Sequence, residues 1–241
     1  MSTTDNVPTP TNTISRRAIF SFGLVALVVI IDQVIKFLIK TRFYLGEDME
    51  ITSWFHLVFV ENNGMAFGMT IGSKYFLTSF RILAVVVLGW YLARLTIRQR
   101  WGEIKTGYLV CIALITAGAL GNIIDCLFYG LIFNNPMPPQ VAVFLPDGGG
   151  YAPFMLGKVV DMFYFPLFSF VWPDWMPWVG GETFLFFQPV FNFADSAISV
   201  GVIALLIFYS GYMSELHALN KSHKDSDSGS SESAETPSAD K

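Results

Sequence analysis

The sequence contains little charge for its size. Only 14% of its 241 residues are charged, whereas 53% are hydrophobic and the mean hydropathy is +0.50. A soluble domain carries about a quarter charged residues, so this chain lacks the polar surface that would let it face water on all sides. The composition excludes an ordinary soluble domain and indicates a membrane protein.

Cysteine and histidine are scarce as well. Cys111 and Cys126 fall in one apolar segment, where the intervening helix would separate them by about 22 Å, too far for a disulfide bond. The three histidines (His56, His217 and His223) show no metal-ligand spacing. No Ser/Lys or Cys/His pairing suggests a nucleophile with its base. The sequence therefore predicts neither a disulfide framework nor a metal centre.

Long apolar runs are what the sequence does have. Four segments, at about 18–40, 75–97, 107–128 and 189–213, meet the length of about 20 apolar residues that a membrane-spanning helix requires. Arg16 and Arg17 before the first run could mark a signal peptide, but the run continues past Lys36 with no small-residue cleavage site after it. We expect an all-α membrane protein with four transmembrane helices in residues 14–219, and disordered ends at 1–13 and 220–241.

The distribution of basic residues predicts how these helices are oriented. Basic residues precede the first helix and fill the short loop between the second and third, whereas the two other loops are richer in acids. The basic set is Arg16, Arg17, Arg94, Arg98, Arg100 and Lys105, and the acidic set is Glu47, Asp48, Glu50, Glu61, Asp147, Asp174 and Glu182. Because short cytoplasmic loops carry an excess of Lys and Arg, both termini should be cytoplasmic and both long loops external.

The two external stretches differ in character. Residues 51–60 are rich in strand-forming residues and end at the turn-like Asn62-Asn63-Gly64, which predicts a small extracytoplasmic β-element. The second stretch is long for a structureless loop and carries Trp172, Trp175 and Trp178. Because tryptophan favours the headgroup region, an aromatic-rich loop along the outer interface is expected. A loop packed on the protein itself is an equally good interpretation.

Polar side chains inside the apolar segments are the most informative feature. A carboxyl in hydrocarbon costs at least about 2.5 kcal/mol, so it usually faces the bundle interior and has a function. With the predicted orientation, such groups from all four helices reach the outer part of the bilayer, and Asp161 is expected in the loop just outside. The set comprises Asp32, Lys36, Arg81, Asn122, Asp125, Asn192 and Asp195.

Several of these groups also have a structural interpretation. Asp32 and Lys36 are four residues apart and can form an ion pair on one helix face. Asp125 follows the small residues of the segment 118–121, so tying helices together is its favoured role. Arg81 can pair with an acid or extend to lipid headgroups.

The surplus of carboxylates at one depth permits two kinds of function. Two carboxylates within a few ångströms share a proton, so that one can activate water while the other protonates an oxygen, which is the chemistry of aspartic proteolysis. Buried charges also mark ion pathways, which leaves a small proton-coupled carrier as the alternative. Carriers often show internal repeats, whereas the two halves of this chain show none.

Five motifs resemble those of the lipoprotein signal peptidase (signal peptidase II) family, in the family's order. They are Asp32-Gln33 with Lys36, Glu61-Asn62-Asn63-Gly64-Met65-Ala66-Phe67-Gly68, Gly118-Ala119-Leu120-Gly121-Asn122-Ile123-Ile124-Asp125, Gly157-Lys158-Val159-Val160-Asp161-Met162-Phe163, and Phe191-Asn192-Phe193-Ala194-Asp195. Any one motif is a weak signal, but five in order on matching elements are highly specific.

The resemblance implies an aspartic endopeptidase of the bacterial inner membrane. Its substrate would be a prolipoprotein already carrying diacylglycerol, cut just before the lipidated cysteine, with Asp161 and Asp195 as the catalytic dyad. The resemblance implies no metal or organic cofactor, and inhibition by globomycin-type compounds. It gives supporting or substrate-binding roles to Asp32, Lys36, Asn62, Gly64, Ala66, Asn122, Asp125, Asn192 and Ala194. We expect a monomer whose partners are membrane lipid and the lipoprotein substrate, with no nucleic acid.

The sequence departs from the family pattern in three places. Cys126 stands where the family usually has arginine, so a salt bridge is missing there or is supplied by another cation such as Arg81. Met162 replaces a phenylalanine that often follows the catalytic aspartate. Two stretches look like insertions, one between Gly130 and Gly157 and one between Phe165 and Gln188. These insertions bear on how the substrate reaches the site and not on the chemistry.

The predicted orientation can be tested by labelling in spheroplasts. Because the loop holding Lys105 should be cytoplasmic, Lys105→Cys should resist an impermeant thiol reagent, whereas Gly149→Cys should react from outside. External labelling of Lys105→Cys would overturn the orientation.

Overall fold

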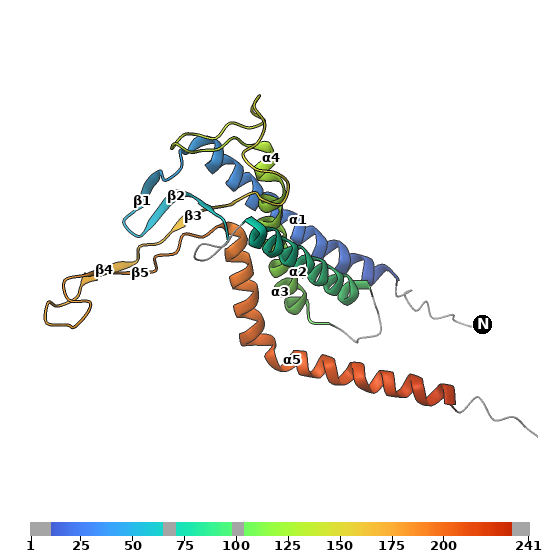
Figure 1. The fold of residues 1–241 in the computed structure, drawn as a ribbon. Helices are drawn as coiled ribbons and strands as arrows, with labels where there is room; N and C mark the ends of the chain where they lie inside the picture. The colour runs from blue at the N-terminus through green and yellow to red at the C-terminus, as the bar shows by residue number, and fades with distance from the viewer. Residues whose placement is uncertain (1–10, 65–70, 98–103, 233–241) are drawn as a thin grey trace, which may run out of the picture.

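The structure is a computed structural model that describes residues 11–64, 71–97 and 104–232. Among these residues, four helices are long and apolar enough to cross a membrane, which confirms the predicted fold class (Figure 1). They are α1 (Thr11–Arg42), α2 (Ile71–Ile97), α3 (Thr106–Ile124) and α5 (Phe193–Glu232).

Helix α3 lies against the three other long helices and is the most buried of the four. Its small residues permit this close approach. A Cβ atom at Gly121 would lie 2.6 Å from Oδ2 of Asp32 on α1, and one at Gly118 would lie 2.6 Å from Cγ1 of Ile198 on α5. Both distances are shorter than real Cβ contacts, so glycine at these positions lets α1 and α5 reach α3.

A three-stranded antiparallel sheet covers one end of the bundle (Figure 1). Strands β1 (Asp48–Thr52) and β2 (Phe55–Asn62) form a hairpin, which confirms the predicted β-element. Strand β3 (Val159–Tyr164) pairs with β2 and places Asp161 opposite Val60. Asp161 therefore lies on a strand, and its expected position in a loop was wrong. The pairing joins segments about a hundred residues apart and has no local sequence signal.

The ends of two predicted helices differ from the structure. Helix α3 ends at Ile124 and continues as a π-helix, Asp125–Tyr129, and then as the short α4, Gly130–Ile132. The last helix begins at Phe193 and not at Pro189, because the residues before it pair with β3: Phe163 and Phe191 exchange two backbone hydrogen bonds of 2.7 and 3.0 Å. At the chain ends, α1 begins at Thr11 and α5 continues to Glu232, into the segment 220–241 for which disorder stays a prediction.

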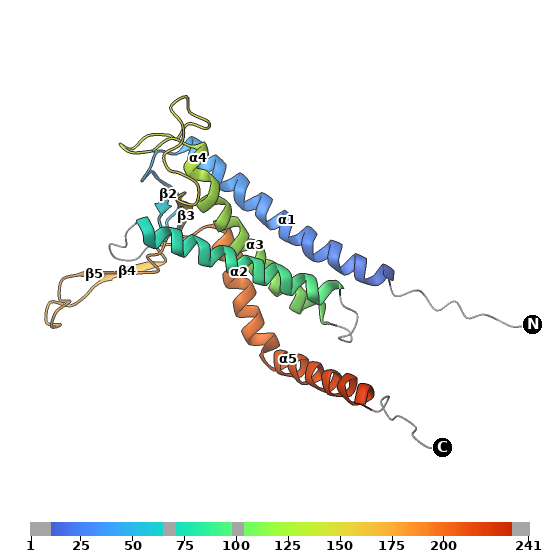
Figure 2. The ribbon, with the colours of Figure 1, turned by 45° about the vertical axis from the view of Figure 1, so that its right-hand side comes forward.

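The two inserted stretches behave differently. The stretch between Gly130 and Gly157 packs on the C-terminal end of α1, where the Ala142 N–H donates to the Lys40 carbonyl at 3.2 Å and the Phe144 ring meets the Phe37 ring. The stretch between Phe165 and Gln188 forms a second antiparallel hairpin, β4 (Phe168–Val171) and β5 (Thr183–Phe186). This hairpin projects sideways from the bundle (Figures 1 and 2).

Candidate active site

A buried lysine lies at the centre of the polar residues. The Lys36 ammonium group is fully buried and lies 3.0 Å from Asp32 Oδ2 on its own helix and 2.8 Å from Asp125 Oδ2 at the end of α3. The predicted ion pair between Asp32 and Lys36 is confirmed. Removing one member of such a cluster leaves an unpaired charge, which costs about 3–5 kcal/mol. The cluster therefore ties α1 to α3 and gives two of the four carboxylates a shared counterion.

Two asparagines connect this cluster to the other two aspartates. Lys36 also donates to Asn122 Oδ1 at 2.9 Å, which orients the amide so that its NH₂ group donates to Asp195 Oδ1 at 2.7 Å. The Asn192 NH₂ group donates to Asn122 Oδ1 at 3.1 Å and to Asp161 Oδ1 at 2.6 Å. The structure thus brings Asp161 and Asp195 to the same pair of amides.

Asp195 owes its position to the start of α5. The Asn192 Oδ1 accepts the Asp195 N–H at 2.9 Å, and the Asp195 Oδ2 accepts the Asn192 N–H at 3.4 Å, which is a reciprocal capping arrangement. The carboxylate lies in the first turn of the helix, where the helix dipole favours a negative charge. Local capping chemistry therefore fixes both residues.

Asp161 is held differently, by the sheet. It is 3% exposed in β3, and its carboxyl is hydrogen-bonded to the side chains of Asn192 and Asn62. Burial and the nearby Asp195 carboxylate together raise the pKa of Asp161 from 3.8 to about 6, against the opposing effect of the hydrogen bonds from Asn192 and Asn62. The two carboxyls thus have different environments, one at the start of a helix and one on a buried strand.

Cys126 and Arg81 lie together, as the departure from the family pattern suggested. The Arg81 guanidinium of α2 donates to Cys126 Sγ at 3.3 Å. Its other nitrogen lies against Gly64, where a Cβ atom would be 2.5 Å away, and Gly64 has a φ of +64°. Arg81 therefore places a cation beside Cys126, in the direction of the turn after β2. Ala66, also predicted for the site, lies outside the described residues.

Sequence reasoning missed several polar side chains that complete the site. Gln33 donates to Asp125 Oδ1 at 2.9 Å and accepts from the Tyr129 hydroxyl at 3.2 Å. Gln33 belongs to the first motif and could have been found there. Further out, Glu61 bridges Lys40 and Lys158, with 2.8 Å to the latter. Lys40 continues the four-residue spacing of Asp32 and Lys36, which was an available signal.

Two backbone contacts link the ionic cluster to the pair of aspartates. Asp32 Oδ1 accepts the Ala194 N–H at 2.9 Å, one residue before Asp195. Asp125 Oδ2 accepts the Val160 N–H at 3.3 Å, one residue before Asp161. Ala194 is fully buried against α3, where a larger side chain would meet Gly121. The cluster thus positions each aspartate through its neighbour in the chain.

Comparisons with known proteins identify the family of the chain. The family described as "Signal peptidase (SPase) II" matches residues 24–210. A lipoprotein signal peptidase of Porphyromonas gingivalis is 51% identical over 187 residues, which cover 78% of this chain and 81% of the relative. That of Amoebophilus asiaticus is 36% identical over 195 residues, covering 77% of this chain and 75% of the relative.

A solved structure supports the fold. A bacterial membrane enzyme determined by the in meso method is 26% identical, with a TM-score of 0.52 over 78% of this chain and 90% of that chain. Family match, curated relatives and spanning helices lead to one conclusion. The chain belongs to the lipoprotein signal peptidase (signal peptidase II) family of bacterial membrane proteases, which remove signal peptides from lipoproteins.

Proposed function

We propose that this protein is an aspartic endopeptidase that cuts diacylglyceryl-modified prolipoproteins just before the lipidated cysteine, with Asp161 and Asp195 as its dyad. One observation carries the assignment of the dyad. Asp32 and Asp125 both form ion pairs with Lys36, whereas Asp161 and Asp195 have amide partners and no cation within ion-pair distance among the described residues. Carboxyls that lack a counterion remain free to exchange protons with water and substrate.

The environments of the two carboxyls suggest their roles. Asp195, in the first turn of α5, is the ionised member and takes a proton from water as the water attacks the scissile carbonyl carbon. Asp161, whose pKa is raised to about 6, is the protonated member and donates to the carbonyl oxygen. When the intermediate breaks down, a carboxyl returns the proton to the leaving amine. The asparagines hold the dyad in place for both steps.

The depth of the dyad suits a lipid-modified substrate. Asp195 lies in the first turn of the span Phe193–Tyr212, and Asp161 lies just outside the spans. Acyl chains anchored in the membrane would hold the scissile bond at this level, where water still arrives, and anchoring would turn a rare encounter into a positioned one. With both termini cytoplasmic, as the basic residues predict, the dyad would face the outer surface.

Asparagine substitutions separate the catalytic from the supporting aspartates. Asp161→Asn and Asp195→Asn should lose turnover almost completely, because asparagine keeps the size and much of the hydrogen bonding but cannot shuttle a proton, and such catalysis is worth about 10²–10⁴-fold. Asp32→Asn and Asp125→Asn should retain slow turnover but melt at lower temperature, because each weakens the cluster around Lys36. Cleavage is measured by the gel mobility of a lipidated prolipoprotein with detergent-purified protein.

Binding of the lipidated prolipoprotein is the control for the two inactive variants. Both should still bind it, which shows that the loss lies in the chemistry and not in folding. Near-normal turnover in either Asp161→Asn or Asp195→Asn would rule out the dyad as assigned.

The raised pKa of Asp161 predicts a specific dependence of stability on pH. Between pH 3.8 and about 6 the folded protein holds a proton that the unfolded chain has released, so the free energy of unfolding falls as the pH rises. At neutral pH a carboxylate at this buried site therefore lowers stability, and Asp161→Asn should melt several degrees above the unsubstituted protein.

This higher melting temperature of Asp161→Asn should disappear below about pH 4, where Asp161 is protonated in both the folded and the unfolded chain. Melting curves in detergent at several pH values measure the effect, and Asp125→Asn serves as the control that is destabilised. An advantage of Asp161→Asn that does not change with pH would contradict the raised pKa.

A further inference from the structure

The hairpin β4–β5 with its tip, residues 165–188, is an arm of unusual composition. Nine of its 24 residues are Phe or Trp, only Asp174 and Glu182 are ionisable, and none is Lys or Arg. Beyond its root, where Phe165 and Phe187 contact Phe191, many of its apolar side chains are exposed. Trp178 is 96% exposed, Trp175 is 78% exposed and Phe168 is 53% exposed. The interpretation of a loop packed on the protein itself is therefore wrong for this segment.

An arm of this kind fits poorly in water. Soluble surfaces rarely present a contiguous apolar patch of this kind unless it binds something. A two-stranded hairpin alone is also marginally stable in water, and β4 and β5 pair only with each other among the described strands. The composition of the arm therefore requires an apolar environment.

The backbone of the arm excludes the hydrocarbon core. Each strand of a two-stranded ribbon leaves one row of N–H and C=O groups without a strand partner, and each unsatisfied group costs several kcal/mol in hydrocarbon. The headgroup region meets both needs of the arm. It covers the apolar side chains, and its water and phosphates can form hydrogen bonds with the unpaired edges of the strands. Tryptophan is enriched at this level for the same reason.

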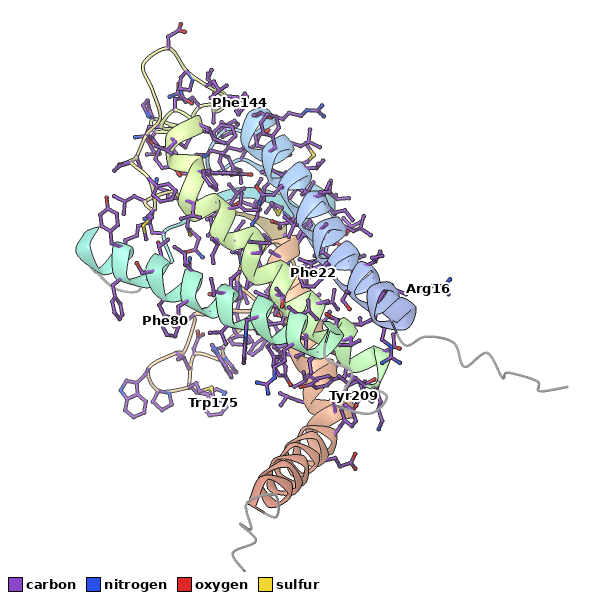
Figure 3. The ribbon with its side chains drawn as sticks, turned by 90° about the vertical axis from the view of Figure 1, so that its right-hand side faces the viewer. Arg16, Phe22, Phe80, Phe144, Trp175 and Tyr209 are labelled. Atoms are coloured by element: carbon purple, nitrogen blue, oxygen red, sulfur yellow. The ribbon has the colours of Figure 1, made fainter. Side chains whose placement is uncertain are left out.

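The position of the arm agrees with that level. It leaves the bundle where the span of α5 begins and extends across the bundle axis (Figures 1 and 2). In the view with side chains, Trp175 at the tip stands clear of the helices (Figure 3). Because the arm leaves the bundle sideways at the end of the spans, it is positioned to lie along a membrane surface.

We propose that the β4–β5 arm is a membrane-docking element that lies in the lipid headgroup region beside the dyad. The assignment of the arm to the outer leaflet rests on the proposed function. Lipid is the occupant that the chemistry favours, because the arm continues the apolar surface of the spanning helices and carries aromatic rings in place of charge.

The root of the arm is built into the site. The arm follows Asp161 by a few residues and returns to Asn192, and Met162 and Phe163 both donate to the Phe191 carbonyl, at 3.1 and 2.7 Å. The Phe165 ring stacks on Phe55 of β2, with ring centroids 4.9 Å apart. Docking of the arm therefore fixes the level of the dyad relative to the lipid surface.

Depth-resolved fluorescence quenching tests the docking directly. Full-length variants that keep Trp175 or Trp178 as the single tryptophan are placed in phosphatidylcholine nanodiscs with bromine on the acyl chains, near either the headgroups or the bilayer centre. We expect both residues to be quenched several-fold more by bromine near the headgroups and to resist aqueous iodide. Trp90, which is 59% exposed within the span of α2, is the control that bromolipid should quench in any case.

Two results would overturn the proposal. Iodide quenching of Trp175 and Trp178 without bromolipid quenching would place the arm in water, and protection from both quenchers would place it against protein. Because the measurement uses no turnover, it stands or falls separately from the aspartic mechanism.

Measurements of activity provide a second test. Trp175→Ser with Trp178→Ser should raise KM for lipidated prolipoprotein several-fold in bilayers and leave kcat unchanged, since the tip touches no residue of the dyad. In detergent the variant should match the unsubstituted protein, and Trp175→Phe with Trp178→Phe should restore KM in bilayers. An equal KM in bilayers for all three proteins would contradict the proposal.

Discussion

The ion cluster around Lys36 is the interaction on which the rest of the site depends. Its two carboxylates, Asp32 and Asp125, each use a second oxygen or a spare lone pair to accept a backbone N–H from a distant element, the start of α5 for Asp32 and β3 for Asp125. A buried ammonium group with two carboxylates tolerates little displacement, because each partner would otherwise be a bare charge at low dielectric. The cluster therefore fixes where the strand and the helix of the dyad meet.

Three local structures complete this arrangement, and each has its own physical cause. The capping pair Asn192 and Asp195 satisfies N–H groups at the start of α5, so the feature that begins the helix also orients the catalytic candidate. The π-helix that begins at Asp125 leaves the Cys126 carbonyl to accept the Gly157 N–H at 2.8 Å. Gly157 also lies against the Asp125 carbonyl, where no Cβ atom would fit, so β3 leaves from a point next to the ion cluster.

Apolar length and the depth of polar groups were sufficient to predict the four spans and most of the residues that converge. Pairs within one helix, such as Asp32 with Lys36, could be predicted because helical spacing sets which side chains meet. The pairing of β2 with β3 could not, because register between distant strands depends on tertiary packing and not on local pattern. The same limit hid the strand position of Asp161 and the start of α5 at Phe193. The segment 165–188 was predicted as an aromatic-rich loop, and its pairing of β4 with β5 was not.

The structure distinguishes two kinds of buried aspartate that the sequence leaves equivalent. Asp32 and Asp125 share a counterion, whereas Asp161 and Asp195 have amide partners, and the proposed dyad rests on this difference. Difference infrared spectroscopy of the carboxyl groups tests this distinction most directly. At about pH 5, below the raised pKa of Asp161, the account predicts that Asp161→Asn loses part of the protonated-carboxyl absorption of the unsubstituted protein and that Asp32→Asn preserves it. An absorption in Asp161→Asn equal to that of the unsubstituted protein would contradict it.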